Sequence, residues 1–266
     1  MPNISIGSSS FHVLDQGRGQ LLLLVHGFPL DHTMWRAQVN ELAKDFRVIA
    51  PDLRGFGQSS PITSDDATVT MAQYADDLAA LLSALNIKEQ VTFCGFSMGG
   101  YIAWQFAARH ADKLGRLFLC DTKAAADTKE AAEGRHKLAT KVAAEGSQVA
   151  ADAMMPKLFS KRAIESKAPC VEETRQTILR TSPRAIAAAL RGMAAREDFT
   201  AKLPAIAVPT LVLCGTEDAI SPPAEMRSIA AAIPRAEYSE IQAAGHMSPV
   251  EDPQAVNRAI RIFLGV

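Results

Sequence analysis

The chain has almost no net charge and no long apolar run. Its 266 residues include 28 Lys and Arg and 29 Asp and Glu, so the formal charge is −1 at pH 7. This balance gives no electrostatic reason to expect a nucleic acid or an anionic membrane as a partner. The longest aliphatic run is Leu21–Val25, whereas a membrane-spanning helix needs about 20 apolar residues. We therefore expect neither a nucleic-acid partner nor a membrane span.

The chain also lacks the cysteine patterns of metal sites and the pattern of a secretory leader. Its four cysteines form no CxxC pair and no Cys/His cluster, which argues against a structural zinc site. The first residues, Met-Pro-Asn-Ile-Ser-Ile-Gly, do not combine a basic segment with an apolar one. We therefore expect a cytoplasmic protein without a metal or a cofactor.

What the chain does contain is an alternation of short apolar runs and longer amphipathic segments. This alternation predicts an α/β fold with a mostly parallel sheet flanked by helices. The expected strands are 3–6, 10–14, 20–26, 46–50, 90–95, 114–120, 210–214 and, more weakly, 237–242. The expected helices are 33–43, 70–85, 98–109, 223–232 and 253–263. In the helix 70–85, the apolar spacing places Asp76 and Asp77 on the solvent side.

One stretch interrupts the alternation. Residues 124–196 carry no strand signal and are rich in alanine and charged residues, and we expect Pro156, Pro169 and Pro183 to divide them into short helices. Such a stretch is too long for a simple connection. We interpret it as a helical cap over the strand ends, with an extra helical layer on one sheet face as the alternative. The predicted division is a catalytic core, 1–123 and 197–266, and a cap, 124–196.

The sharpest local motif is Gly95-Phe96-Ser97-Met98-Gly99-Gly100. It follows an apolar strand and leads directly into a helical pattern, which is the context required for the nucleophile turn G-x-S-x-G. Gly95 and Gly99 leave room around a strained turn that exposes Ser97 at the carboxyl end of the sheet. The alternative is an ordinary helix start with Ser97 as its cap, but the flanking strand and helix favour a nucleophile.

A serine hydroxyl needs a nearby base and an acid that orients the base. Among six histidines, His246 lies in a glycine-bearing loop between the last strand and the last helix, and this loop returns to the same sheet edge. Asp218 directly follows a predicted strand and is the preferred acid. Glu217 and Asp121, which ends the preceding strand, are the alternatives. The chain order Ser97, Asp218, His246 matches one class of triad.

Two further loops follow strands. The segment His26-Gly27-Phe28-Pro29 ends the first long strand, and we expect the backbone amides of Phe28 and Met98 to form an oxyanion hole. We expect His26 to orient this loop. The glycine-rich segment 52–59 lacks the spacing of phosphate-binding motifs, so we interpret it as a structural loop in which Asp52 and Arg54 tie turns together.

These motifs together carry a family resemblance. They are HGFP at 26–29, DLRGFGQS at 52–59, GFSMGG at 95–100, GTEDAISPP at 215–223 and AGHMSPVEDP at 244–253. With them the chain resembles the α/β-hydrolase superfamily, and within it the small esterases, the 3-oxoadipate enol-lactonases and the cofactor-free haloperoxidase or perhydrolase group. The resemblance implies an eight-stranded sheet with an antiparallel second strand and a cap that shapes the substrate pockets. It places nucleophile, acid and base at Ser97, Asp218 and His246.

We therefore expect a serine hydrolase that cleaves small carboxylic esters through an acyl-enzyme on Ser97. Phe28 and Trp35 are the candidate substrate-binding residues, although core packing explains Trp35 equally well. Further pocket candidates in the cap are Met154, Met155 and Phe159, and core packing explains the two methionines equally well.

Three alternatives stay open at this point. The first two are an enol-lactonase-type lactone hydrolase and a perhydrolase or haloperoxidase, which use the same residues. The third is a non-catalytic ligand-binding module on the same fold. The sequence leaves open the acyl and alcohol groups of the substrate and the oligomeric state.

Overall fold

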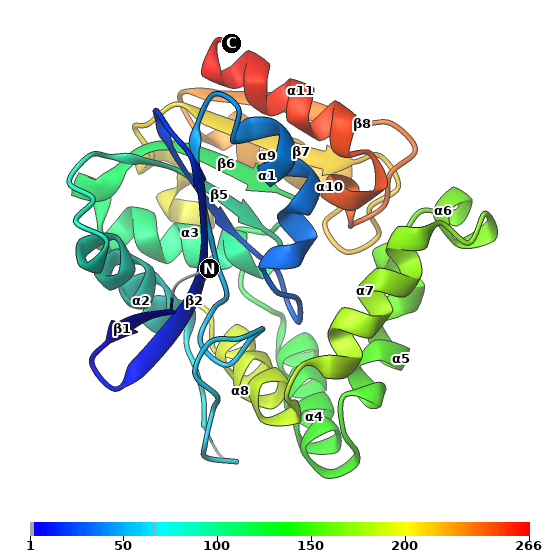
Figure 1. The fold of residues 1–266 in the computed structure, drawn as a ribbon. Coiled ribbons are helices and arrows are strands. Elements are labelled where there is room, and N and C mark those ends of the chain that lie inside the picture. The colour runs from blue at the N-terminus through cyan, green and yellow to red at the C-terminus, as the bar shows by residue number, and fades with distance from the viewer. Residues whose placement is uncertain (1–2, 66) are drawn as a thin grey trace.

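The computed structural model describes residues 3–65 and 67–266. A central eight-stranded sheet runs through the molecule, with helices on both of its faces (Figure 1). Its strands are β1 (Asn3–Ile6), β2 (Ser9–Gly17), β3 (Leu21–Val25), β4 (Arg47–Pro51), β5 (Val91–Phe96), β6 (Leu114–Cys120), β7 (Thr210–Gly215) and β8 (Ala236–Ile241).

The strand order is β1-β2-β4-β3-β5-β6-β7-β8. Strand β2 is antiparallel to both of its neighbours, and β4, β3, β5, β6, β7 and β8 pair in parallel. Every residue of β3, β5 and β7 is buried, as expected where helices cover both faces of a parallel sheet. The predicted fold class, a mostly parallel sheet with an antiparallel second strand, is confirmed.

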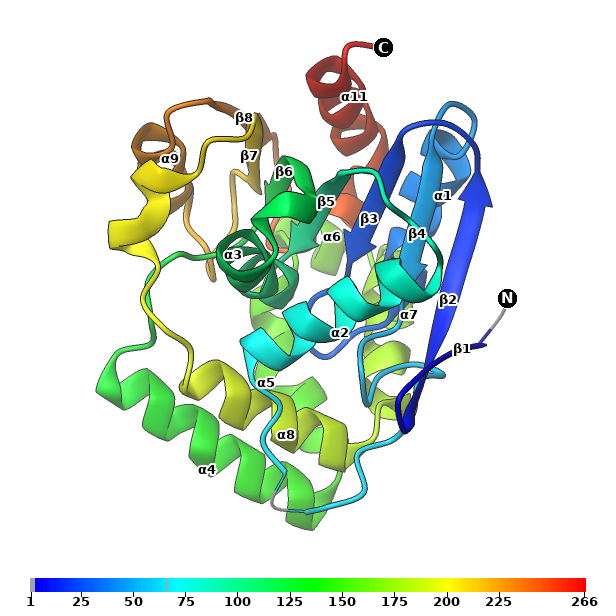
Figure 2. The same ribbon diagram turned by 90° about the vertical axis from the view of Figure 1, so that its left-hand side faces the viewer.

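Helices of the core lie on the two faces of this sheet (Figures 1 and 2). One face carries α1 (Arg36–Leu42) and α11 (Pro253–Leu264), which contact each other. The other face carries α2 (Met71–Ala84), α3 (Met98–Arg109) and α9 (Pro223–Ala232). The remaining short helices of the core are η1 (His32–Trp35), η2 (Ala111–Lys113), η3 (Thr200–Ala205) and α10 (Ser248–Glu251).

In α2 the expectation for Asp77 is wrong. Its carboxylate is buried and accepts a 2.8 Å hydrogen bond from Nε of Arg54. The apolar spacing of α2 could not reveal this, because the partner lies on a loop that precedes the helix. Arg54, expected to tie turns together, instead ties its loop to helix α2.

Between β6 and η3 the chain forms five α-helices, which we call the helical insertion. They are α4 (Lys129–Glu145), α5 (Gln148–Leu158), α6 (Lys161–Glu165), α7 (Pro169–Arg180) and α8 (Pro183–Ala194). They gather beyond the carboxyl ends of the parallel strands and not on a sheet face (Figure 1). Pro169 and Pro183 start helices as predicted, but α5 runs through Pro156. A proline so close to a helix end disrupts little of the remaining ladder.

Close packing explains why α8 is rich in alanine. Ala185, Ala187, Ala188 and Ala189 are buried, and α8 packs closely against the neighbouring helix α4. At Gly192, an added Cβ would lie only 1.8 Å from the backbone oxygen of Val69, so the helix touches the core backbone directly. Within the described residues, no helix is both long and apolar enough to cross a membrane.

Candidate active site

Ser97 occupies a strained turn between β5 and α3. Its φ is +51°, which is rare for a residue with a side chain. An added Cβ at Gly95 would lie 2.5 Å from the backbone oxygen of Gly99, and one at Gly99 would lie 2.4 Å from that of Val25. The two glycines are therefore required by backbone contacts, as the strand-turn-helix motif predicted.

The structure brings Ser97, His246 and Asp218 together from three separate loops at the carboxyl edge of the sheet. Nε2 of His246 lies 2.9 Å from Oγ of Ser97, and Nδ1 lies 2.8 Å from Oδ2 of Asp218. A carboxylate can only accept, so Nδ1 carries the proton and the Nε2 lone pair faces the hydroxyl. His246 and Asp218 are both buried, which protects this arrangement from competing water.

The position of Asp218 is fixed by its own loop. Its Oδ1 accepts hydrogen bonds from the backbone amides of Ile220 at 2.7 Å and Ser221 at 2.9 Å. One oxygen therefore holds the carboxylate in place while the other faces His246.

The two alternative acids have other partners. Asp121 is fully buried and accepts hydrogen bonds from the Gly215 amide at 2.8 Å and from Oγ of Ser248 at 2.5 Å. Burial, with the nearby charge of Asp218, raises the pKa of Asp121 well above its usual range. Glu217 is exposed and accepts a bond from the backbone amide of Lys161 in the helical insertion. Of the three candidate acids, Asp218 is the one hydrogen-bonded to His246.

The backbone amides of Phe28 and Met98 are both available as donors. Met98 begins α3, and the first amides of a helix have no acceptor within the helix. The Phe28 amide makes no hydrogen bond within residues 3–65 and 67–266. Free amides beside Ser97 are the groups that an oxyanion hole needs.

His26 fixes the loop that carries Phe28. Its Nε2 accepts a 3.0 Å hydrogen bond from the amide of Leu53, and its Nδ1 lies 2.9 Å from the carbonyl oxygen of Gly27. The ring is fully buried, and this burial lowers its pKa. The predicted orienting role of His26 is therefore visible in its contacts.

Above Ser97 lies a cavity of about 450 Å³. Ser97, His246 and Phe28 lie on its core side, and the insertion contributes its opposite wall. The insertion residues along the wall include Ala131, Gly134, Arg135, Leu138, Met154, Lys157, Leu190 and Met193. Of the pocket residues expected from sequence, Phe28 and Met154 line this cavity.

Trp35 does not reach the cavity. It is 0% exposed in the core, where its ring meets that of Phe96 edge-on at 6.4 Å, and it is not among the described residues that line the cavity. The core alternative therefore accounts for Trp35. Met155 and Phe159 also pack against the core.

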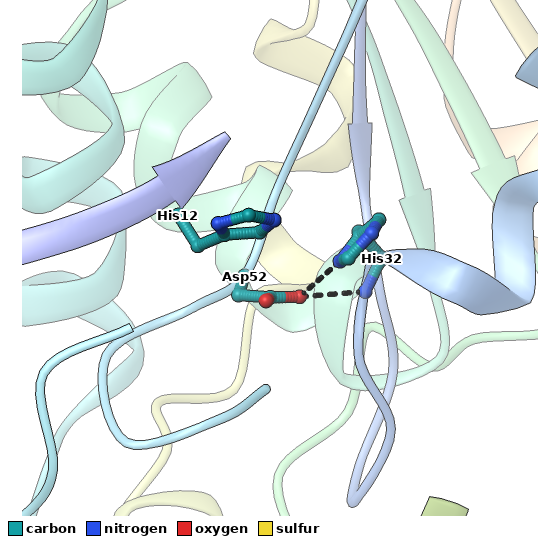
Figure 3. Close-up of side chains that lie close together, drawn as sticks. All are labelled: His12, His32 and Asp52. Atoms are coloured by element: carbon teal, nitrogen blue, oxygen red, sulfur yellow. Dashed lines mark hydrogen bonds and ion pairs between the residues drawn. The ribbon is translucent and has the colours of Figure 1, made fainter. Parts of the chain in front are cut away.

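A second histidine-carboxylate cluster, His12, His32 and Asp52, is drawn in Figure 3, and its residues are not among those that line the cavity. Asp52 accepts hydrogen bonds from Nδ1 of His32 at 2.7 Å, from the His32 amide at 2.8 Å and from the Gln58 amide at 2.9 Å. His12 completes the cluster, and its ring centroid lies 5.3 Å from that of His32. Asp52 thus ties two turns together, as predicted.

Within residues 3–65 and 67–266, two groups of side chains have the chemistry of metal ligands. They are His12, His32 and Asp52, and Asp121, Asp218 and His246; within each group the ligand atoms lie within 4.8 Å of one another. The carboxylates in both groups already accept hydrogen bonds from named N–H or O–H donors. Hydrogen bonding therefore explains why the side chains in each group lie close together.

Comparison with known proteins places the chain in a family. A family profile described as alpha/beta hydrolase fold matches residues 20–253. The chain belongs to the α/β-hydrolase fold family. This family of hydrolases includes the AB hydrolase superfamily protein YisY of Bacillus subtilis (strain 168), 34% identical over 264 residues that cover 94% of each chain. The 3-oxoadipate enol-lactonase 1 of Acinetobacter baylyi is 29% identical over 235 residues, 88% of this chain and 84% of that protein.

Solved structures of α/β hydrolases point to the same neighbours. A thermophilic esterase from Thermogutta terrifontis, solved with malate bound, is 44% identical with a TM-score of 0.95, covering 99% of this chain and 97% of that one. The enol-lactonase from Burkholderia xenovorans LB400 is 32% identical with a TM-score of 0.90, covering 100% of both chains. This α/β hydrolase therefore has both esterases and enol-lactonases among its relatives.

Proposed function

We propose that the protein is a serine hydrolase that cleaves small carboxylic esters through an acyl-enzyme on Ser97. The observation that carries this proposal is the hydrogen-bonded series from Asp218 through His246 to Oγ of Ser97, with distances of 2.8 and 2.9 Å. The 44% identity to an esterase of nearly equal length supports the substrate class.

In the proposed mechanism, Oγ of Ser97 attacks the ester carbonyl while Nε2 of His246 takes its proton. Asp218 stabilises the imidazolium that forms. The amides of Phe28 and Met98 donate to the oxyanion of the tetrahedral intermediate. His246 then gives its proton to the leaving alcohol, and a water molecule deprotonated by His246 releases the acid.

We also propose the division into a catalytic core, 1–123 and 197–266, and a cap, 124–196. The cavity supports it, since one wall comes from the core and the other from the helical insertion. In this division the core supplies the reacting groups, and the cap selects the small-molecule substrate.

Lactone hydrolysis is the second candidate. Its support is the 32% identity to an enol-lactonase over the full length of both chains. A lactone is a cyclic ester, so the same residues would act on it in the same order, and side-by-side rates on linear esters and an enol-lactone distinguish the two.

The test is Ser97→Ala with 4-nitrophenyl acetate as substrate. Loss of the nucleophile should lower kcat by at least about 10³-fold, while the thermal unfolding curve stays close to that of the wild type. A fluorophosphonate probe should label the wild type and not the variant. Turnover at the wild-type rate by purified Ser97→Ala would overturn the proposal.

A further inference from the structure

The insertion side of the cavity carries positive charge that the proposed reaction does not use. Lys157 lies in the last turn of α5, lines the cavity and is exposed. It has no ion-pair partner among residues 3–65 and 67–266. By contrast, Lys123, which also lines the cavity, lies 3.0 Å from a carboxylate oxygen of Glu225 and is therefore neutralised.

Asp127, which also lines the cavity, is shared by two guanidinium groups. Asp127 pairs with Nε of Arg135 at 2.5 Å and with NH1 of Arg196 at 2.7 Å. Burial opposes ionisation of Asp127, but the hydrogen bonds and charges of the two arginines outweigh it and lower the pKa of Asp127. The Asp127 carboxylate is therefore ionised, and Arg196 also lies near the charge of Asp198.

The geometry leaves part of Arg135 free for a ligand. Its Nε and NH2 face Asp127, whereas its NH1 meets the sulfur of Met193 at 3.6 Å, and sulfur is a weak acceptor. Arg196 is fixed in place, since its guanidinium stacks 4.4 Å above the ring of Tyr101. Arg196 therefore holds Asp127 in place, and the guanidinium of Arg135 lines the cavity.

The charge balance of this wall calls for an anion. Among the described residues that line this side, Lys157 and Arg135 are positive and Asp127 is negative, so one positive charge is uncompensated. Much of the remaining lining is apolar, with residues such as Leu138, Met154 and Leu190. Cations beside apolar walls attract an anionic group more strongly than they would in open water.

We propose that the cavity contains a carboxylate subsite formed by Lys157 and Arg135. The favoured substrate is then an ester or lactone that bears a second, ionised carboxyl group, such as the half-ester of a short dicarboxylic acid. This inference rests on the proposed hydrolysis at Ser97 and specifies its substrate class. A cavity of about 450 Å³ is within the range of pockets for small organic ligands.

The experiment compares two esters of nearly equal shape. Monoethyl succinate carries a carboxylate at the position where ethyl isocaproate carries an isopropyl group of similar shape. The wild type should hydrolyse the anionic ester with a kcat/KM about tenfold higher, mostly through a lower KM, and added salt should reduce this preference.

Lys157→Gln removes one charge from the subsite. It should raise KM for monoethyl succinate by about fivefold and leave ethyl isocaproate within about twofold. Lys137→Gln is the matched control, because Lys137 is an exposed lysine of α4 that does not line the cavity. It should leave both substrates unchanged. Binding of succinate, measured by calorimetry for the same three proteins, adds a readout that needs no turnover.

The outcomes separate the two proposals. If both esters are hydrolysed at equal rates and Lys157→Gln changes neither, the subsite is overturned while hydrolysis at Ser97 stands. If neither ester is hydrolysed but succinate binding weakens in Lys157→Gln alone, the subsite stands and the proposed reaction is overturned. If the wild type neither hydrolyses these esters nor binds succinate, both are overturned.

Discussion

At the residue scale, His26 shows how burial couples protonation to stability. Its pKa is lowered by burial, so the folded protein holds a neutral ring below the ordinary value of about 6.5, where the unfolded chain already binds a proton. The unfolded state then binds more protons than the folded state. The free energy of unfolding therefore falls as the pH decreases below that value.

We predict that His26→Asn weakens this pH dependence. The variant should be less stable than the wild type by about 1–3 kcal/mol at pH 7, because hydrogen bonds to Leu53 and Gly27 are disturbed. Its further loss on acidification to pH 5 should be smaller by up to about 1.4 kcal/mol per pH unit. Urea unfolding across this pH range measures both effects. The same substitution at the exposed His136 is the control, and parallel curves for His26→Asn and wild type would contradict the prediction.

Asp218 and Asp121 allow a second residue-scale prediction. Asp218→Asn should lower kcat by about 10²–10⁴-fold, since an amide cannot hold His246 in the productive tautomer. Asp121→Asn should lower kcat less than tenfold and cost about 1–3 kcal/mol of stability, because the Asp121 carboxyl bonds Gly215 and Ser248 and not His246. Steady-state rates and thermal melts of the two variants separate these roles. A larger kcat loss in Asp121→Asn would show that Asp121, directly after β6, is the acid that orients His246.

At the element scale, two helices each contain a glycine, but only one of the two positions requires a residue without a side chain. An added Cβ at Gly99 would meet the backbone oxygen of Val25 at 2.4 Å, whereas one at Gly134, in the middle of α4, would meet nothing within 4 Å. Gly134→Ala should therefore stabilise the protein by about 0.5–1 kcal/mol. Gly99→Ala should destabilise it by at least about 1–3 kcal/mol. Thermal denaturation measures both, and a destabilised Gly134→Ala would show that α4 needs a glycine there.

The elements that sequence predicted best are those whose limits are set locally. Helix α3 begins at the Ser97 turn and α9 begins at a proline, and both agree with the predicted bounds. Two features were not predicted, one because it depends on a distant partner and one because its segment is too short to show a pattern. Asp77 is buried because Arg54 reaches it from another loop. The short helix α10, directly after the His246 loop, carries no periodic pattern that could have revealed it.

At the scale of the whole molecule, the meeting of Ser97, Asp218 and His246 could be expected from sequence. The ion pairs beside the cavity could not. Parallel strands bring their carboxyl ends to one edge, so topology predicted that Ser97, His246 and a carboxylate meet there, with Asp218 preferred over Asp121 and Glu217. No such rule connects Asp127 with Arg196, which are far apart in sequence and come together only when the helical insertion folds back on the core. Trp35 was equally undetermined, since an aromatic residue near a loop fits a pocket or a core.

The histidine loop is held between the core and the helical insertion. Glu251 of α10 accepts a 2.8 Å hydrogen bond from the Gly245 amide through Oε1, and its Oε2 accepts bonds from the amide and hydroxyl of Ser160 at 3.1 and 2.5 Å. The amide of Met247 also donates to the carbonyl oxygen of Leu158 at 3.0 Å. The position of His246 thus depends on how the insertion docks.

We therefore predict that Glu251→Gln impairs both stability and turnover. An amide NH₂ in place of one carboxylate oxygen would face the N–H of either Ser160 or Gly245, which costs about 1–3 kcal/mol. Because the loop that carries His246 is then held less firmly, kcat should fall by about tenfold while KM changes less. The matched control is Glu237→Gln, an exposed glutamate of β8, which should behave as the wild type in melts and rates. If Glu251→Gln melts at the lower temperature and yet keeps the wild-type kcat, docking of the insertion stabilises the fold without positioning His246.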